Sequence, residues 1–396
     1  MRPRKTGVGL TARRVRLMGL TFEIAVLAGD GIGAEVTPSA LVVASEAMAA
    51  AGGPKLVLNA QPAGAAHFQH TGSALPEETL RACEAADAIY LGAMGLPDVR
   101  YPDGTEITPQ IALRIHFDLY AGLRPTRAIP GVPAALADPE AGRIDFALVR
   151  ESTEGLFASY GKGEVEGDRA RDTQVITRDA TLRVSRFAFD LAVQRGARGD
   201  GASGAAVTLV DKANVFASFA FMRRVFDEVA AGYPAVTPHH LYVDAAALAF
   251  VTKPWTFDVI VTENMFGDIL SDLAAGLVGG MGYAPSADIG DRHAVFQPAH
   301  GSAPDIMGTG RANPTAAILS AALMLDWLGQ RHGMTAATDA AMLINRAVDA
   351  AFADGGLRTA EHGGSAGVRE VTDHVLDHLR QSTTPSVSTP AAPPLL

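Results

Sequence analysis

Cysteine is almost absent from the sequence, and long apolar runs are missing altogether. Cys83 is the only cysteine, which excludes an internal disulfide framework and fits a reducing compartment, so we expect a cytoplasmic protein. No apolar run reaches the ~18 residues of a membrane-spanning helix, which predicts a protein without a membrane partner. Basic residues are outnumbered by acidic ones, which gives a formal net charge of −10. This negative charge disfavours nucleic acid and anionic membrane surfaces as partners.

The chain does hold enough apolar material for a large core. Its 396 residues are 48% hydrophobic and 19% charged, so we expect two domains or one large α/β unit. Strand-like and helix-like patterns alternate along the chain, and residues 23–29, 144–152 and 206–214 have the pattern of strands. This alternation predicts the α/β fold class.

The two ends differ in composition from the rest. The first 22 residues contain six basic side chains and no acid, which is compatible with an organelle presequence or with a translation start at Met18. We expect residues 1–21 to be a disordered basic extension. Residues 381–396 are rich in proline, serine and threonine, and we expect them to form a disordered tail.

A predicted strand at 257–264 is followed by a predicted helix that carries two acids. Asp268 and Asp272 are four residues apart, so their carboxylates project from one helical face. A third acid, Asp244, lies at the start of another predicted helix. Oxygen ligands of this kind suit Mg²⁺ or Mn²⁺. The alternative is that Asp268 and Asp272 form a solvated helix face and Asp244 is a helix cap.

The glycine-rich segment 29–35, GDGIGAE, lies between a predicted strand and a predicted helix. It satisfies the dinucleotide fingerprint G-x-G-x-x-A of a Rossmann site. That fingerprint expects an acid about 20 residues later, but no Asp or Glu occurs between Glu46 and Glu77. Asp30 also places a negative charge where a pyrophosphate would lie. We therefore interpret the glycines as a tight turn.

Several cationic residues lie at the edges of predicted elements. Arg114, Arg124 and Arg150 have planar guanidinium groups, which suit the carboxylates of a di- or tricarboxylic acid. For each arginine taken alone, a surface ion pair is the more common explanation. Lys212 ends an apolar strand, where it is a candidate catalytic base or a salt-bridge partner of its neighbour Asp211.

Seven motifs occur in a fixed order: GDGIGAE, LYAGLRP, RESTEG, DKAN, YVDAAA, ENMFGDILSD and PAHGSAPDIMGTGRANPTAAILSA. Together they resemble the isocitrate/isopropylmalate dehydrogenase family, the metal-dependent β-decarboxylating dehydrogenases, over about residues 22–380. The likeness is closest to the 3-isopropylmalate, tartrate and D-malate branch. It implies the two-domain α/β fold of that family, which is not a Rossmann fold.

The resemblance also implies how the chain is divided. A large cofactor-binding domain is expected from residues 22–119 and 280–380, with a dimerisation and metal-site domain inserted at 120–279. The insert carries the dimer contacts, partly through an arm at 153–178. The implied homodimer shares its active site between the two subunits.

The family motifs assign roles to the residues that match them. Arg114, Arg124 and Arg150 are expected to hold the substrate carboxylates. Asp268 and Asp272 are expected to bind the metal together with Asp244 of the second subunit, which also supplies Lys212. The loop that holds the adenosine part of NAD is expected to comprise His300, Gly301, Ser302, Ala303, Asp305 and Asn313. An acid at Asp305 favours NAD over NADP.

The implied reaction is an oxidative decarboxylation. Lys212 takes the hydroxyl proton of a (2R)-hydroxy acid as hydride leaves for NAD⁺, and Mg²⁺ or Mn²⁺ stabilises the enolate after CO₂ is lost. The family has a tyrosine after the TEG turn to protonate carbon, but this chain has Phe157 there. We therefore take Tyr160 as the candidate acid.

Substrate choice in this family depends on the segment just before the LR motif. Thr108 and Gln110 lie near the polar positions of the isocitrate enzymes, whereas Ile107 and Ile111 offer apolar surface. We expect 3-isopropylmalate or a close 3-alkylmalate first, then tartrate or D-malate, then isocitrate. Two other classes stay open: a metal-free Rossmann dehydrogenase, and a family member that binds ligand without turnover because of Phe157.

Overall fold

The computed structural model describes residues 21–199 and 204–383. The expected basic extension at 1–21 lies outside these residues except for Thr21, which begins the first strand. Of the expected tail, residues 384–396 also lie outside, whereas 381–383 end the last helix. No helix in the described part of the chain is long and apolar enough to cross a membrane.

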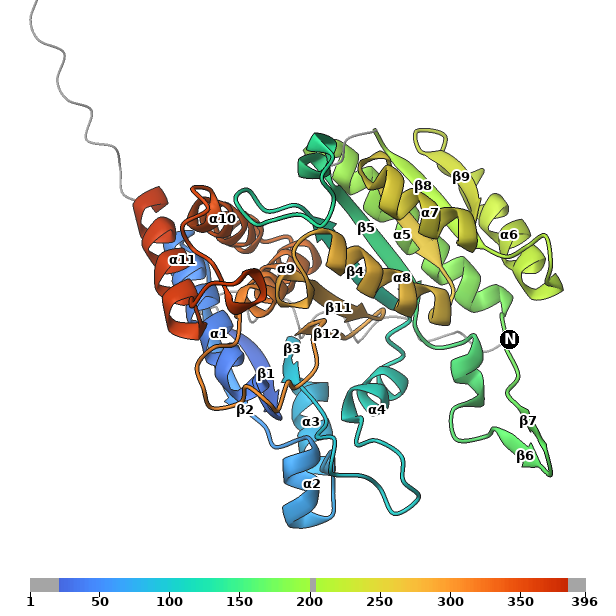
Figure 1. Ribbon diagram of the computed structural model, residues 1–396, viewed down its shortest axis with the longest axis horizontal. Coiled ribbons are helices and arrows are strands. Elements are labelled where there is room, and N and C mark those ends of the chain that lie inside the picture. Colours follow the sequence, from blue (N-terminus) through green and yellow to red (C-terminus); the bar gives the residue numbers. More distant parts are fainter. Residues whose placement is uncertain (1–20, 200–203, 384–396) are drawn as a thin grey trace, which may run out of the picture.

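A single mixed sheet of ten strands runs through the described part of the chain (Figure 1). Its strands, in spatial order, are β2 (Lys55–Ala60), β1 (Thr21–Gly29), β3 (Ala88–Ala93), β12 (Ala294–Pro298), β11 (Pro285–Ile289), β4 (Ala121–Arg127), β5 (Asp145–Glu151), β10 (Val259–Thr262), β8 (Ala206–Asp211) and β9 (Thr237–Tyr242). The centre is antiparallel, because β11 runs against both of its neighbours and β4 runs against β5. The outer pairs are parallel, which is the pattern that βαβ crossovers produce.

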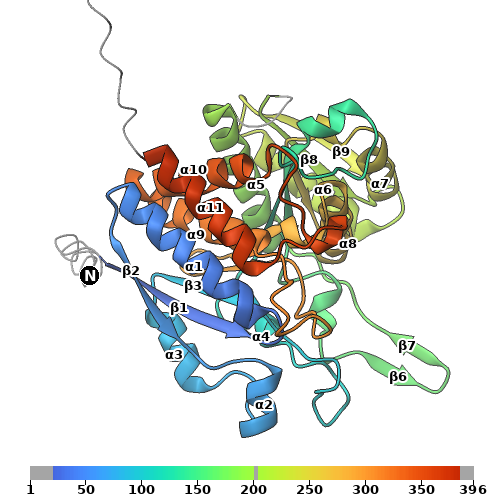
Figure 2. The ribbon, with the colours of Figure 1, turned by 60° about the vertical axis from the view of Figure 1, so that its left-hand side comes forward.

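Helices cover both halves of this sheet. On the half that contains β1 they are α1 (Gly33–Ala50), α9 (Thr315–His332), α10 (Thr335–Phe352) and α11 (Val368–Thr383), which lie side by side in Figures 1 and 2. Near β3 lie α2 (Ala65–Thr71), α3 (Glu77–Ala85) and α4 (Pro109–His116) (Figure 1), and side chains of α3 and α4 pack in one apolar cluster with Ile89 and Leu91 of β3. On the half that contains β8 they are α5 (Arg178–Arg198), α6 (Ala217–Ala230), α7 (Val243–Thr252) and α8 (Asn264–Leu277).

The helices near β10 are sorted to opposite faces by the alternation of side chains along that strand. Val259 and Val261 pack in the same apolar cluster as Val184 and Phe189 of α5. Ile260 points the other way and packs with residues of α7 and α8. Successive side chains of a strand face opposite sides, so this buried valine–isoleucine run requires cover on both faces.

The chain builds part of one half of the sheet, crosses to build the whole of the other half, and then returns to complete the first. Strands from residues 21–93 and 285–298 form one half, and strands from residues 121–262 form the other. The α/β class is thereby confirmed. Division into two domains at 120 and 280 stays a prediction, since the sheet is continuous between β11 and β4.

A short hairpin leaves the body of the molecule within the predicted arm at 153–178. Its strands β6 (Glu164–Glu166) and β7 (Arg169–Arg171) project away from the main sheet in both views (Figures 1 and 2). Every residue of the two strands is exposed, including Val165 with 81% of its surface accessible.

The glycine turn at 29–35 fits the tight-turn interpretation. Gly31 has φ +54°, and a Cβ there would lie 2.0 Å from the carbonyl oxygen of Ser302. Asp30 is buried and accepts hydrogen bonds from the backbone amides of Ala65, Ala66 and Gly95 at 2.7–2.9 Å. Its charge is therefore satisfied inside the protein, where it ties the turn to the start of α2.

Candidate active site

The three predicted arginines converge at the centre of the sheet. Arg114 comes from α4, Arg124 from β4 and Arg150 from β5, and all three are buried. Arg114 Nη2 donates to Asp288 Oδ2 at 3.0 Å, and Arg124 Nη2 donates to Asp288 Oδ1 at 3.2 Å. These are therefore not the separate surface ion pairs that each arginine alone would have allowed.

Strand register explains the convergence. Asp288 lies opposite Gly122 on β4, and Gly122 lies opposite Arg150 on β5, so the three form one row across three antiparallel strands. Arg124 is two residues beyond Gly122 and therefore shares its face. A Cβ on Gly122 would lie 2.6 Å from Ser152 Oγ, 3.3 Å from Asp288 Oδ1 and 3.4 Å from Arg150 Cβ. Glycine at this position lets the charged side chains meet.

The buried charges shift one another's pKa values. Burial raises the pKa of Asp288, but the nearby Arg114 and Arg124 outweigh burial and lower it to about 2. Burial lowers the pKa of Arg150 to about 10, with Asp268 opposing the change and Arg114 and Arg124 adding to it. Asp288 is thus ionised, and Arg150 stays protonated at neutral pH.

Arg150 is held from several sides. Asn264 Oδ1 accepts from Arg150 Nε at 2.9 Å and from Nη2 at 2.5 Å, while Asn264 Nδ2 donates to the Glu154 carbonyl at 3.0 Å. The Phe157 ring lies 5.4 Å from the guanidinium carbon. A Cβ on Gly267 would lie 2.7 Å from Arg150 Cβ, so helix α8 presses directly on this arginine.

Helix α8 presents the predicted pair of acids beside the arginines. Glu263 caps the helix by accepting from the amides of Met265 and Phe266 at 3.1 and 2.7 Å. Asp268 is bonded to Arg150 Nη1, with its side chain 60% exposed. Partial burial and the charge of Asp268 raise the pKa of Asp272.

Lys212 and Asp244 form an ion pair with each other. Lys212 follows β8, and its Nζ is bonded to Asp244 Oδ1 at the start of α7. Asp211 instead accepts two hydrogen bonds from Arg223, at 2.8 and 2.7 Å, so the alternative pairing of Lys212 with Asp211 is wrong. Hydrogen bonding by Lys212 lowers the pKa of Asp244.

Within residues 21–199 and 204–383 no three acidic, histidine or cysteine side chains gather closely enough to hold a metal ion. Asp268 and Asp272 lie one turn apart on α8, and Asp244 belongs with Lys212 instead. The donor set of two carboxylates fits a hard divalent cation that takes further oxygen ligands from elsewhere. Completion of the site by the second subunit stays a prediction.

The predicted cofactor loop lies against the glycine turn. The Ile32 amide donates to the Ser302 carbonyl at 2.8 Å, and Ala303 has φ +37°. His300 has a buried Nε2 atom without a hydrogen-bond partner in the described chain, and burial lowers its pKa. Gly301 and Asp305 are exposed on the same loop. This accessible backbone with one unsatisfied imidazole nitrogen fits a polar ligand.

Asn313 is fixed by its neighbours. Its Oδ1 accepts from the Thr315 amide at 3.0 Å and from the Thr315 hydroxyl at 2.7 Å, and its Nδ2 donates to Glu361 Oε2 at 2.9 Å. Glu361 also accepts from the Thr359 hydroxyl at 3.0 Å. These hydrogen bonds fix the orientation of the Asn313 side-chain amide without any ligand.

The remaining predicted residues separate into two groups. Gln110 lies one turn before Arg114 on α4, and Gln110 Oε1 and Arg114 Nε are buried atoms without a partner in the described chain. Thr108 is half-buried at the start of the same helix. Tyr160 is 49% exposed at the end of a short 3₁₀ turn. Burial, and after it the nearby Tyr160, raise the pKa of Tyr101. The structure places Phe157, and not Tyr160, against Arg150.

Asp288 and Asn264 were missed by the sequence reasoning. Asp288 is the only acid in a fully buried strand, and a buried acid signals a charged or hydrogen-bonding partner. Asn264 stands inside the ENMFGDILSD motif as the first residue of α8, but its spacing alone gives no indication of a contact with Arg150.

A cavity of about 500 Å³ lies on the far side of the same central strands. Leu123 and Ile289 line it, whereas their neighbours Arg124 and Asp288 belong to the arginine cluster. Because successive side chains alternate between faces, the cavity and the cluster are separated by the sheet itself. The cavity is therefore not the candidate active site.

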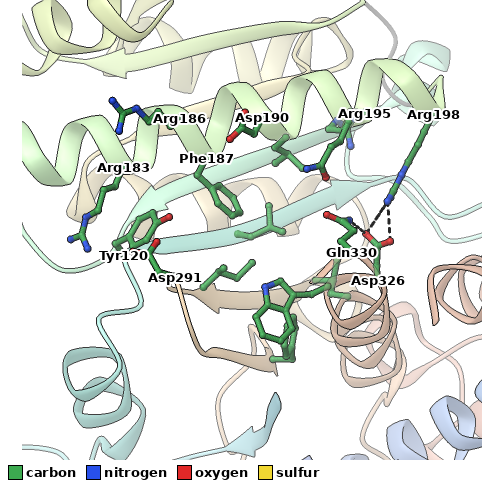
Figure 3. Close-up of a pocket in the computed structure, with 17 residues that line it drawn as sticks. Tyr120, Arg183, Arg186, Phe187, Asp190, Arg195, Arg198, Asp291, Asp326 and Gln330 are labelled. Carbon is green, nitrogen blue, oxygen red and sulfur yellow. Dashed lines mark hydrogen bonds and ion pairs between the residues drawn. The ribbon is translucent and has the colours of Figure 1, made fainter. Parts of the chain in front are cut away.

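Figure 3 shows this cavity between helix α5 and helix α9. Phe187 points into it from α5, and Arg198 reaches across to Asp326, with Nη2–Oδ1 and Nη1–Oδ2 distances of 2.9 and 3.2 Å. Arg198 and Asp326 thus join the two halves of the molecule at the back.

On this α/β fold, the buried arginine cluster has the chemistry to bind the carboxylates of small acids. Residues 23–375 match the sequence pattern of the isocitrate/isopropylmalate dehydrogenase family. The chain belongs to this family, as its motifs indicated, and it is an oxidoreductase of the decarboxylating dehydrogenase type.

Curated relatives carry related names. The 3-isopropylmalate dehydrogenase of Salinibacter ruber is 45% identical over 351 residues, which are 86% of this chain and 90% of that protein. The 3-isopropylmalate/3-methylmalate dehydrogenase of Methanocaldococcus jannaschii is 41% identical over 360 residues, 91% of this chain and 99% of that protein.

Solved structures confirm the family fold. An isocitrate dehydrogenase from Methylococcus capsulatus superposes with a TM-score of 0.75 at 34% identity, covering 91% of this chain and 100% of that one. A β-decarboxylating dehydrogenase from Thermococcus kodakarensis gives 0.73 at 38% identity, covering 91% and 96%. The Rossmann alternative is accordingly wrong.

Proposed function

We propose that this protein catalyses the NAD-dependent, divalent-metal-dependent oxidative decarboxylation of a 3-substituted (2R)-malate, with 3-isopropylmalate as the first candidate. The buried cluster of Arg114, Arg124 and Arg150 carries the proposal, because guanidinium groups held in low dielectric grip carboxylates strongly. The names of the curated relatives support a 3-alkylmalate over a tricarboxylic acid.

Asp268 and Asp272 would hold Mg²⁺ or Mn²⁺ together with Asp244 of a second subunit. When bound, the cation would polarise the substrate hydroxyl and stabilise negative charge after CO₂ leaves. Burial first, and then repulsion from Asp268, raise the pKa of Asp272, and the bound ion would relieve the repulsion between the two carboxylates.

A homodimer is part of the proposal. Helices α7 and α8 expose apolar side chains beside the acids, namely Leu248 (63%), Val251 (47%), Met265 (39%) and Ile269 (61%). Exposed apolar stripes of this kind favour association with another subunit. The projecting hairpin β6–β7 offers a second contact.

Lys212 is the proposed base for the hydroxyl proton. Its side chain is 24% exposed and is already paired with Asp244, so a metal that recruits Asp244 would weaken this pair and free the lysine. Tyr160 is the proposed acid for the final proton, an assignment supported by its position along the chain, since Phe157 has no proton to give.

The loop with His300, Ser302 and Asp305 would hold the adenosine part of NAD, and Asn313 would contact adenine. Gly301 and Ala303 belong to the same loop. An exposed carboxylate at Asp305 would accept from ribose hydroxyls and repel a 2′-phosphate, which supports NAD over NADP.

A substrate panel tests the proposal. NADH formation with Mn²⁺ is measured for 3-isopropylmalate, D-malate, tartrate, isocitrate and homoisocitrate, with NADP⁺ and EDTA as comparisons. The proposal predicts the highest kcat/KM for 3-isopropylmalate with NAD⁺ and loss of activity in EDTA. Highest activity with tartrate, D-malate or isocitrate would reassign the substrate, and no turnover of any acid would indicate a member that only binds ligand.

A further inference from the structure

Asp288 already binds two of the arginines that the proposed function assigns to the substrate carboxylates. Its two carboxylate oxygens accept from different arginines, Oδ2 from Arg114 and Oδ1 from Arg124. Gln297 Nε2 adds a third hydrogen bond at 3.2 Å. The side chain is only 2% exposed, so this carboxylate is a fixed part of the site.

The local charge count follows from this arrangement. Arg114, Arg124 and Arg150 bring three positive charges, and Asp288 cancels one of them. Asp268 and Asp272 lie toward the helix α8 side, where the proposed cation would balance them. Two positive charges then remain for the substrate, which matches the two carboxylates of a hydroxy diacid. A third carboxylate would enter a buried site without a matching cation.

We propose that Asp288 is a specificity-determining residue. It pairs with Arg114 and Arg124 and neutralises one of their two positive charges, which restricts the site to dicarboxylic hydroxy acids. The inference rests on the proposed function and deepens it. It assigns the discrimination between diacid and triacid to a residue on β11, outside the segment before Arg114 where sequence reasoning placed substrate choice.

A purely structural ion pair is the competing explanation for the same contacts. Such a pair would affect folding, or lower activity toward all substrates alike. A specificity role instead changes the ratio between substrates that differ by one carboxylate. The ratio therefore separates the two explanations, even when the variant loses some stability.

The test compares the wild type with Asp288→Asn, which keeps the shape and removes the charge, and with Asp288→Ser as a second variant. For each, kcat/KM is measured with 3-isopropylmalate and with isocitrate, at saturating Mn²⁺ and NAD⁺. We expect the isocitrate-to-isopropylmalate ratio to rise at least tenfold in Asp288→Asn, through a lower KM for isocitrate. Asp326→Asn removes an acid paired with Arg198 on the far face of the sheet and should leave the ratio unchanged.

Binding of unreactive acids makes the test independent of turnover. Calorimetric titration with tricarballylate and with methylsuccinate, in the presence of Mn²⁺, should show the triacid gaining at least tenfold relative to the diacid in Asp288→Asn. An unchanged binding ratio in folded variants, judged by their melting curves, would overturn the role of Asp288. A shifted binding ratio without turnover of any acid would overturn the proposed function alone.

Discussion

Asn264 accepts two hydrogen bonds from the guanidinium of Arg150, at 2.9 Å from Nε and 2.5 Å from Nη2. This single side-chain oxygen fixes the plane of an arginine that is 4% exposed. Because Asn264 also donates to the Glu154 carbonyl, its side chain joins the start of helix α8 both to Arg150 on β5 and to the turn that follows β5.

We expect Asn264→Ala to lower kcat/KM toward the diacid substrate, mainly by raising KM. Hydrogen bonds to a charged group contribute about 1.5–3 kcal/mol, which corresponds to a loss on the order of 10- to 100-fold. Steady-state kinetics measures this effect. Asn345→Ala is the matched control, because Asn345 bonds only the Ala341 carbonyl of its own helix α10 in the described contacts. Equal losses in both variants would argue against the positioning role of Asn264.

Gly122→Ala tests whether Asp288 and Arg150 can pack across Gly122 only because this residue has no side chain. The added methyl would meet Ser152 Oγ at 2.6 Å and crowd both charged residues, so we expect a loss of about 1–3 kcal/mol in the free energy of unfolding. Urea unfolding gives this value. Gly142→Ala is the control, because a Cβ there meets no atom within 4 Å. If Gly122→Ala is as stable as this control, the proposed crowding is wrong.

The stability contributed by Asp288 should depend on pH in a defined window. Its folded-state pKa of about 2 lies below the ordinary value of 3.8, so its contribution is present above about pH 4 and is lost as pH falls toward 2. A shift of this size corresponds to about 2 kcal/mol. The difference in unfolding free energy between wild type and Asp288→Asn should be constant from pH 5 to 8 and shrink below pH 4. A difference that grows on acidification contradicts the assignment.

Metal binding should be visible as a change in stability. Mn²⁺ at about 100 times its Kd should stabilise the wild type by about 2.7 kcal/mol, because it binds only the folded state. Asp272→Asn should abolish most of this gain, and Asp339→Asn, which removes an exposed acid on helix α10, should retain it. Melting curves with and without Mn²⁺ provide the measurement. Retention of the full gain in Asp272→Asn would exclude Asp272 from the metal site.

Much of this architecture follows from local sequence patterns. The α/β class follows from alternating apolar runs, and the glycine turn follows from the absence of a suitable acid after Glu46. The arginines were predicted to bind carboxylates from their side-chain chemistry alone, and the structure shows that they are buried and cluster around Asp288 and Asp268.

Contacts between distant strands could not be predicted in the same way. Asp288 and Arg124 are 164 residues apart in sequence, and they meet only because β11 inserts antiparallel beside β4. The preference of Lys212 for Asp244 over its neighbour Asp211 likewise depends on Arg223, which reaches Asp211 from helix α6. From the sequence, Phe157 could be recognised only as the replacement of an expected tyrosine. Its contact with the Arg150 guanidinium depends on how the turn after β5 folds, which the sequence does not indicate.

Sharing of the active site between subunits is the central claim, and a complementation experiment tests it most directly. Lys212→Met and Asp272→Asn are each expected to be inactive. When they are co-refolded in equal amounts, half of the dimers combine both chains, and each such dimer regains one intact site, so activity should reach about a quarter of wild type. A mixture as inactive as its two components would show that Lys212 and Asp272 act within the same chain.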